Sequence, residues 1–153
     1  MRPKTTVLIL ALSILAGAMC FASPQMGTWK LNEAKSKLDP SMGKNNTVTY
    51  ESAGNKIKVT VDGTEAKGKP HHDEWVGRFD GKDYPVTGDP SSDMRSYKQV
   101  NDHTMDIMVK KDGKLVATGQ IMVAADGKSR TVKISGTTAK GKKFHSMGFY
   151  DRQ

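Results

Sequence analysis

Apolar and polar residues alternate along most of this chain after about residue 26. Thr47 to Glu51 (TVTYE) and Lys56 to Val61 (KIKVTV) carry an apolar side chain at every second position. Successive side chains of an extended strand point to opposite faces, so this pattern indicates antiparallel sheet with one buried and one solvated side. Strands are expected near 27–31, 46–52, 55–62, 70–79, 83–87, 94–101, 103–111, 114–125, 128–136 and 142–151.

Turn signals separate these segments. The dipeptides Asp80-Gly81, Asp112-Gly113 and Asp126-Gly127 each precede a lysine. Asp-Gly readily adopts the positive φ that a tight hairpin turn needs, so all three are expected to connect strands. Only one short segment favours a helix: Asn32 is a possible cap, and Pro40 ends whatever turn or two forms after it.

The number and spacing of the strands predict the fold class. Nine or ten strands at roughly 8–12-residue spacing are typical of an all-β sandwich or barrel. Short turns between consecutive strands favour an up-and-down meander over a Greek key. A meander with one apolar face can satisfy both of its edges by closing on itself. We therefore predict a single antiparallel up-and-down β-barrel of about 8–10 strands with one short N-terminal helical turn, in preference to a sandwich.

The N-terminus has the organisation of a secretory signal peptide. A positive stretch over residues 1–4 precedes a dozen mostly apolar residues, Val7 to Ala18, and small residues follow. The apolar stretch is short for a membrane span. Cleavage is expected after Ala22, with Ala18 as an alternative, which leaves a barrel domain over 23–153. The leader also carries Cys20, the only cysteine of the chain, so the mature protein has no disulfide.

Composition and charge exclude several classes of protein. The chain has 153 residues and a formal net charge of +8, which falls to +6 when Arg2 and Lys4 leave with the leader. These values argue against a multidomain enzyme, a disulfide-stapled mini-protein and a polytopic membrane protein. Secretion argues against nucleic acid as a partner, and no stable membrane insertion is expected once the leader is removed.

Two segments of the chain resemble each other. Residues 61–69 (VDGTEAKGK) match residues 134–142 (ISGTTAKGK), so a strand and the turn that follows it recur. Either a duplicated half-barrel or shared turn chemistry would explain the match. Lysines cluster beside both turns. If the two turns lie at one end of the barrel they form a cationic rim, and otherwise the charge is dispersed over a soluble surface. The lysines concerned are Lys67, Lys69, Lys140, Lys142 and Lys143.

The first expected strand resembles that of a known group. Gly27-Thr28-Trp29 is similar to the Gly-x-Trp opening of lipocalins and the wider calycin group, and the chain as a whole resembles small secreted bacterial lipocalin-like proteins of largely uncharacterised function. In calycins this tryptophan closes one barrel end and stacks against a basic residue near the last strand. The resemblance implies that role for Gly27, Trp29 and Arg152, the last as a cation–π partner. It also implies a monomer secreted into the periplasm.

The resemblance further implies non-covalent binding of a small hydrophobic or amphipathic ligand inside the barrel. A packed core built from the same residues is the alternative, and it corresponds to a ligand-free structural or protein-interaction barrel of the cell envelope. The alternation of apolar and polar residues does not distinguish a ligand-binding lumen from a packed core. The residues expected to line the lumen are Tyr50, Val59, Trp75, Phe79, Tyr84, Met105, Ile107, Leu115, Ile121, Phe144 and Tyr150.

Catalytic and metal-binding signatures are weak. His71-His72-Asp73-Glu74 is the richest cluster of metal-ligating types, but in a strand the two histidines point to opposite faces. The mature chain has no cysteine and no Gly-x-Ser-x-Gly elbow, and its Gly-Lys pairs lie in turns rather than in a phosphate-binding loop. We therefore expect no enzyme activity, no metal and no cofactor.

Overall fold

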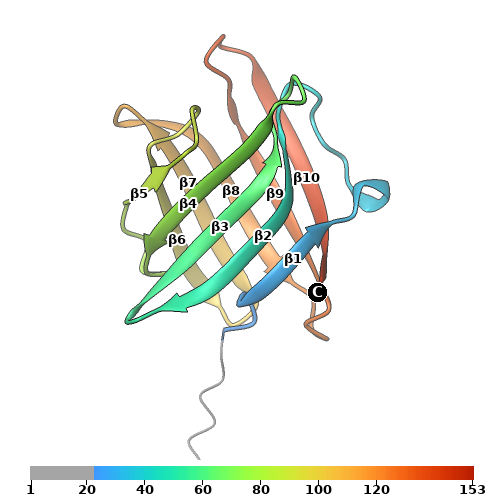
Figure 1. The fold of residues 1–153 in the computed structure, drawn as a ribbon, viewed down its shortest axis with the longest axis vertical. Coiled ribbons are helices and arrows are strands. Elements are labelled where there is room, and N and C mark those ends of the chain that lie inside the picture. Colours follow the sequence, from blue (N-terminus) through green and yellow to red (C-terminus); the bar gives the residue numbers. More distant parts are fainter. Residues whose placement is uncertain (1–22) are drawn as a thin grey trace, which may run out of the picture.

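The computed structural model describes residues 23–153 (Figure 1). The predicted signal peptide, residues 1–22, lies outside the described residues. The strands are β1 (Gly27–Leu31), β2 (Lys44–Ala53), β3 (Lys56–Thr64), β4 (Pro70–Gly77), β5 (Tyr84–Thr87), β6 (Met94–Asn101), β7 (Thr104–Lys111), β8 (Lys114–Val123), β9 (Ser129–Thr137) and β10 (Lys143–Arg152). A single 3-10 turn, η1 (Glu33–Lys35), follows β1. Within residues 23–153, no helix has the length and hydropathy to span a membrane.

The strands form one closed antiparallel barrel. Each pairs with its neighbours in the chain, and β1 pairs with both β2 and β10. Trp29 stands opposite Val48 on one side and opposite Arg152 on the other, so the short N-terminal strand β1 joins the two ends of the meander. The predicted fold class, an all-β up-and-down barrel, is confirmed. Asn32 caps η1 by accepting a hydrogen bond from the backbone N–H of Lys35.

The two similar sequence segments form equivalent hairpins at the same end of the barrel (Figure 1). In the β3–β4 hairpin the N–H of Glu65 donates to the carbonyl of Lys69 at 2.8 Å, and in the β9–β10 hairpin Thr138 donates to Lys142 at the same distance. The five lysines of the two hairpins are all exposed. We call them the lysine rim and their end of the barrel the lysine end.

The opposite end is covered by the residues that precede β1, and we call it the closed end. Gln25 is fully buried there, and its carbonyl accepts a 2.9 Å hydrogen bond from the indole N–H of Trp29. Arg152, at the end of β10, donates to the carbonyls of Pro24 and Met26. The first described residues therefore belong to the barrel structure.

Gly27 is needed for this closure for two reasons. Its φ is +103°, a backbone conformation that side-chain-bearing residues rarely adopt, and a Cβ atom placed there would lie 3.0 Å from the Nη1 of Arg152. Gly54, in the β2–β3 turn, also has a positive φ (+64°) but has open space around it.

Replacing Gly27 by alanine should therefore cost more stability than replacing Gly54. Gly54→Ala forces alanine into the left-handed conformation and should lower the free energy of unfolding by about 1 kcal/mol. Gly27→Ala also displaces Arg152, so it should lower the free energy of unfolding by at least about 2 kcal/mol. Urea unfolding of the two variants and the parent measures the difference. Equal losses would show that the contact between Gly27 and Arg152 does not constrain the closed end.

Candidate ligand site inside the barrel

Trp29 and Arg152 meet as the calycin resemblance implies. The guanidinium carbon of Arg152 lies 4.2 Å from the centroid of the Trp29 ring, which is a cation–π contact. All three nitrogens of this guanidinium donate to backbone carbonyls: Nε to Gly127, and the two Nη atoms to Met26 and Pro24. Arg152 is therefore fully engaged in holding the closed end together.

A second arginine, Arg130 on β9, reaches the same tryptophan from inside the barrel. Its side chain is buried, with 2% of the residue exposed. The guanidinium carbon lies 4.9 Å from the ring centroids of Trp29 and Tyr50 and 5.0 Å from that of Tyr150. Two of its nitrogens, Nε and Nη1, have no hydrogen-bond partner. We call Arg130 and these three rings the arginine cage.

Large aromatic side chains fill the barrel interior on the side of β2 to β6. The Trp75 ring packs edge-on against Tyr97 at 4.8 Å and against Tyr84 at 5.6 Å, and stacks with Phe79 at 6.4 Å. Tyr50 contacts Phe79 and Tyr97, both at 6.3 Å. This aromatic cluster is a packed core, so the lumen is not open throughout.

A buried polar network lies between the aromatic cluster and the lysine end. Arg95 on β6 is held between two carboxylates: Nη1 lies 3.2 Å from Asp73 on β4, and Nη2 lies 3.5 Å from Asp89 in the β5–β6 loop. Asp73 also bonds the Nε2 of His71 at 2.8 Å, and the hydroxyl of Ser92 donates to Asp89. Unlike Arg130, Arg95 therefore has its charge neutralised by neighbouring side chains.

The polar network spans the weakest seam of the barrel wall. The short strand β5 makes only two residue pairs with β4 and two with β6. Arg95 links β4, β6 and the loop between β5 and β6, and its carbonyl accepts a 2.8 Å hydrogen bond from the indole of Trp75. These side-chain bonds connect strands that the backbone ladder joins poorly.

Tyr150, Tyr97, Arg95 and Arg152 keep their ordinary charge states at neutral pH. Burial raises the pKa of Tyr150 to about 12 and also raises that of Tyr97, so both phenols stay protonated. Burial alone would lower the pKa of Arg95, but Tyr97 and Asp73 raise it above its ordinary value. Burial lowers the pKa of Arg152, and the positive charge of Arg130 lowers it further.

Most residues expected to line the lumen do point into the barrel. Phe79 and Tyr84 are partly buried and pack against the core, and the Tyr84 hydroxyl donates to Asp80 at 2.8 Å. Phe144 is buried toward the lysine end, where β10 begins. Buried in the interior are Tyr50, Val59, Trp75, Met105, Ile107, Ile121, Phe144 and Tyr150.

Leu115 is the exception, and its predicted place in the lumen is wrong. It is 55% exposed. A β-bulge lies between β7 and β8, where Val109 stands opposite Ala117 but Lys110 stands opposite Leu115, so Val116 has no partner on β7. One extra residue reverses the side to which all following side chains point. The bulge therefore interrupts the alternation between Ala117, which points inward, and Leu115, which points outward.

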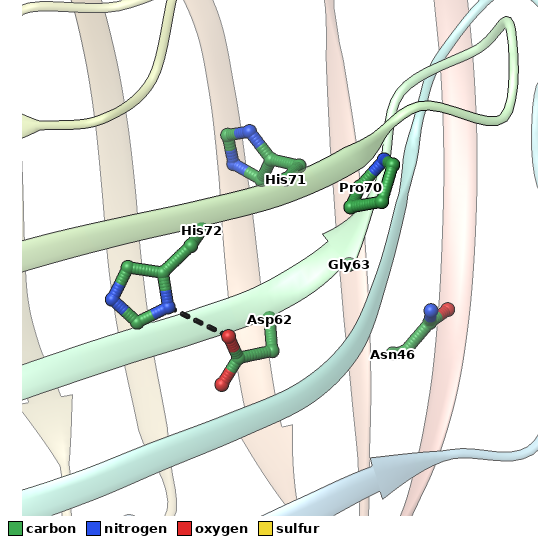
Figure 2. Close-up of a pocket in the computed structure, with 6 residues that line it drawn as sticks. All are labelled: Asn46, Asp62, Gly63, Pro70, His71 and His72. Carbon is green, nitrogen blue, oxygen red and sulfur yellow. Dashed lines mark hydrogen bonds and ion pairs between the residues drawn. The ribbon is translucent and has the colours of Figure 1, made fainter.

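Two hollows are open to solvent at the barrel surface. The smaller, about 340 Å³, lies where β2, β3 and β4 meet near the lysine end and includes Asn46, Gly63 and Pro70 (Figure 2). The larger, about 600 Å³, crosses the middle of β7 to β10 and includes Asp106, Gln120, Lys133 and His145. The aromatic cluster lines neither of them.

The histidine pair does not form a metal site. His71 bonds Asp73 inside the barrel, whereas His72 bonds Asp62 at 2.6 Å on the outer surface, as Figure 2 shows. The two rings thus lie on opposite faces of β4. In the described part of the chain, no three His, Cys, Asp or Glu side chains come close enough together to hold a metal ion.

Sequence patterns alone did not identify the buried charges, although a signal was present. Arg130 shares its strand face with Val132 and Ile134, and Asp73 shares its face with Trp75. A charged residue in the apolar register of a strand is a candidate for a functional role.

Comparison with known proteins adds little to this geometry. Neither a protein-family model nor a curated protein matches the sequence. Among solved structures, a redesigned β-barrel, mFAP1, bound to DFHBI is similar with a TM-score of 0.43 and 19% sequence identity, over 85% of this chain and 98% of that chain. The description of the fold and site therefore rests on the residues of this chain.

The corrected position of Leu115 predicts a contrast between two residues of β8. Leu115→Ala should change the free energy of unfolding by less than about 0.5 kcal/mol, because the side chain is already in water. Ile121→Ala should cost about 2–4 kcal/mol, because Ile121 is buried in the core. Chemical denaturation of both variants tests this. A large loss for Leu115→Ala would place that side chain inside.

The polar network predicts an acid-sensitive contribution from Asp89. Burial alone would raise the pKa of Asp89, but hydrogen bonds from Ser91 and Ser92 and the charge of Arg95 hold it below its ordinary value. A lowered folded-state pKa stabilises the protein above the unfolded value near 3.9, and this contribution is lost as pH falls through the folded value.

The parent should therefore be more stable than Asp89→Asn at pH 7 and at pH 5, and the difference should shrink as pH falls below about 4. Urea unfolding of both proteins at pH 7, 5, 4 and 3 measures it, with Asp112→Asn as an exposed control. A difference that is constant over this range would contradict the assignment.

Proposed function

We propose that the protein binds a small amphipathic or apolar molecule non-covalently inside its barrel. The observation that carries this proposal is the unequal lining of the interior. The aromatic cluster occupies the side of β2 to β6, whereas the inward positions of β8 and β9 toward the lysine end are small: Ala117, Gly119 and Gly136. A Cβ atom at Gly119 or Gly136 would collide with the backbone of a neighbouring strand, so these two glycines allow the strands to approach closely, and the space for a ligand would lie beside Ala117 on this wall.

The two ends of the barrel support one direction of access. The closed end is covered by Gln25 and the hydrogen bonds of Arg152, so a ligand would enter from the lysine end. Ligand binding would then transfer apolar surface from water to the wall of β8 to β10, and the exposed lysines would attract a negatively charged group.

We also propose that the protein acts in the periplasm and that it is not an enzyme. With a secretory leader over residues 1–22, the mature domain would act in the periplasm as a monomeric carrier rather than as an enzyme. Its hydrophobic ligand would be sheltered from water during transit.

The rival function is a ligand-free structural or interaction barrel of the cell envelope. The aromatic packing and the larger hollow across the outer face of β7 to β10 favour this alternative. The two functions differ in whether the interior next to Ala117 is empty enough to accept added atoms.

Ala117→Phe tests that difference directly. If the wall beside Ala117 faces free space, the added ring should be accommodated within about 1 kcal/mol, whereas overpacking a filled core costs about 1–3 kcal/mol or more. Thr118→Phe, on the outer face of the same strand, is the matched control. Decanol binding, followed by the fluorescence of the two buried tryptophans, should be seen in the parent and in Thr118→Phe but not in Ala117→Phe.

The outcome separates the two functions. Ala117→Phe with parental stability and no decanol binding supports the carrier. Strong destabilisation by Ala117→Phe, together with no decanol binding by the parent, rejects the carrier in favour of the ligand-free barrel.

A further inference from the structure

Three arginines point into this barrel, and the chain compensates their charges in different ways. Arg152 gives all its nitrogens to backbone carbonyls, and Arg95 lies between the carboxylates of Asp73 and Asp89. Arg130 is as deeply buried as either, yet no acidic side chain in residues 23–153 forms an ion pair with it. Its Nε and Nη1 have no partner.

An unneutralised buried guanidinium is costly. Moving an ion from water into a protein interior is strongly unfavourable unless hydrogen bonds or an opposite charge offset the lost hydration. The three rings of the arginine cage offset part of this penalty through cation–π contacts. They supply no acceptor for the N–H groups. Arg152 shares the Trp29 ring, so a second positive charge lies nearby.

We propose that Arg130 is an internal anion subsite that receives the carboxylate of an amphipathic ligand. This inference rests on the lumen-binding function proposed above and names the chemical class of the ligand. The partnerless Nε and Nη1 of Arg130 supply the donors, and a guanidinium pairs well with a carboxylate. One carboxylate would neutralise the single guanidinium charge of Arg130, so a monoanion matches this subsite better than a doubly charged phosphate does.

The surroundings of Arg130 set the orientation of that ligand. The closed end lies beyond Trp29, where Gln25 fills the space, so the tail must point toward the lysine end. The Tyr150 ring lies over Gly148, the next inward position of β10 in that direction. Its phenol stays protonated at neutral pH and so adds no negative charge beside the carboxylate. The lysine rim attracts an anion to the open end.

Three probes of equal chain length separate charge from apolar binding: decanoate, decanol and decylammonium. Binding is followed by tryptophan fluorescence and isothermal titration calorimetry in the parent, in Arg130→Met and in Arg78→Met, an exposed control. The parent and Arg78→Met should bind decanoate at least tenfold more tightly than decanol, and decylammonium most weakly. Arg130→Met should bind decanol as the parent does and lose the preference for decanoate. Arg130→Lys, which keeps the charge without the planar fork, should lie between them.

A small anion tests the anion subsite independently, because it has no tail that must fit into the lumen. Formate, titrated against chloride at constant ionic strength, should raise the melting temperature of the parent but not that of Arg130→Met. Near-UV circular dichroism checks that each variant keeps its packed aromatic core. If Arg130→Met does not fold, Arg130→Lys replaces it as the variant whose anion preference is compared with that of the parent.

The possible failures are distinguishable. If the parent binds decanol and decanoate equally, or if Arg130→Met keeps the decanoate preference, the anion subsite is rejected and the lumen function stands. If no amphiphile binds but formate stabilises the parent alone, the amphipathic ligand is rejected and the anion subsite stands. If neither binds, both proposals fail.

Discussion

The structure depends on the closure of the barrel through β1. This five-residue strand is the only connection between β2 and β10, and Trp29 at its centre is fully buried. The ring is fixed by a hydrogen bond to Gln25 on one side and by Arg152 on the other. Without this contact the meander would have two open edges, and the inward faces of all ten strands would lose their common interior.

Closure of the barrel also determines which charged side chains are buried. Arg130 lies at the second position of β9, and only the neighbouring β10, β1 and β2 place Tyr150, Trp29 and Tyr50 around its guanidinium. The same closure brings Asp73 on β4 to Arg95 on β6 across the short strand β5. One arginine thus acts as a link across a weak seam, while the other remains available for a ligand. This contrast within a single interior is the main support for an anion subsite.

Much of the fold could be predicted from the sequence, because strand alternation and Asp-Gly turns are local signals. The Gly-x-Trp opening located the closed end as well, since Gly27 and Trp29 meet Arg152 there. The position of Leu115 could not be predicted, because the bulge at Val116 arises from the pairing of β7 with β8 and leaves no mark in the alternation. The residues that fill the interior also share their pattern with those that would line a cavity.

The charged part of the site was missed for a different reason. Alternation assigns charged residues to the solvated face, so it does not mark Arg130, Arg95 and Asp73 as buried, although each occupies the apolar register of its strand. Whether such a charge is paired depends on strands far away in sequence. Asp73 and Arg95 find each other only because β4 and β6 flank the short β5.

Native mass spectrometry of the folded protein, purified from its own source, shows whether the barrel carries an anionic amphiphile. We predict a mass above that of the mature chain by one small anionic amphiphile. This ligand should be released on denaturation, and decanoate added to the refolded protein should restore a one-to-one adduct. A bare mature mass that decanoate leaves unchanged would contradict it.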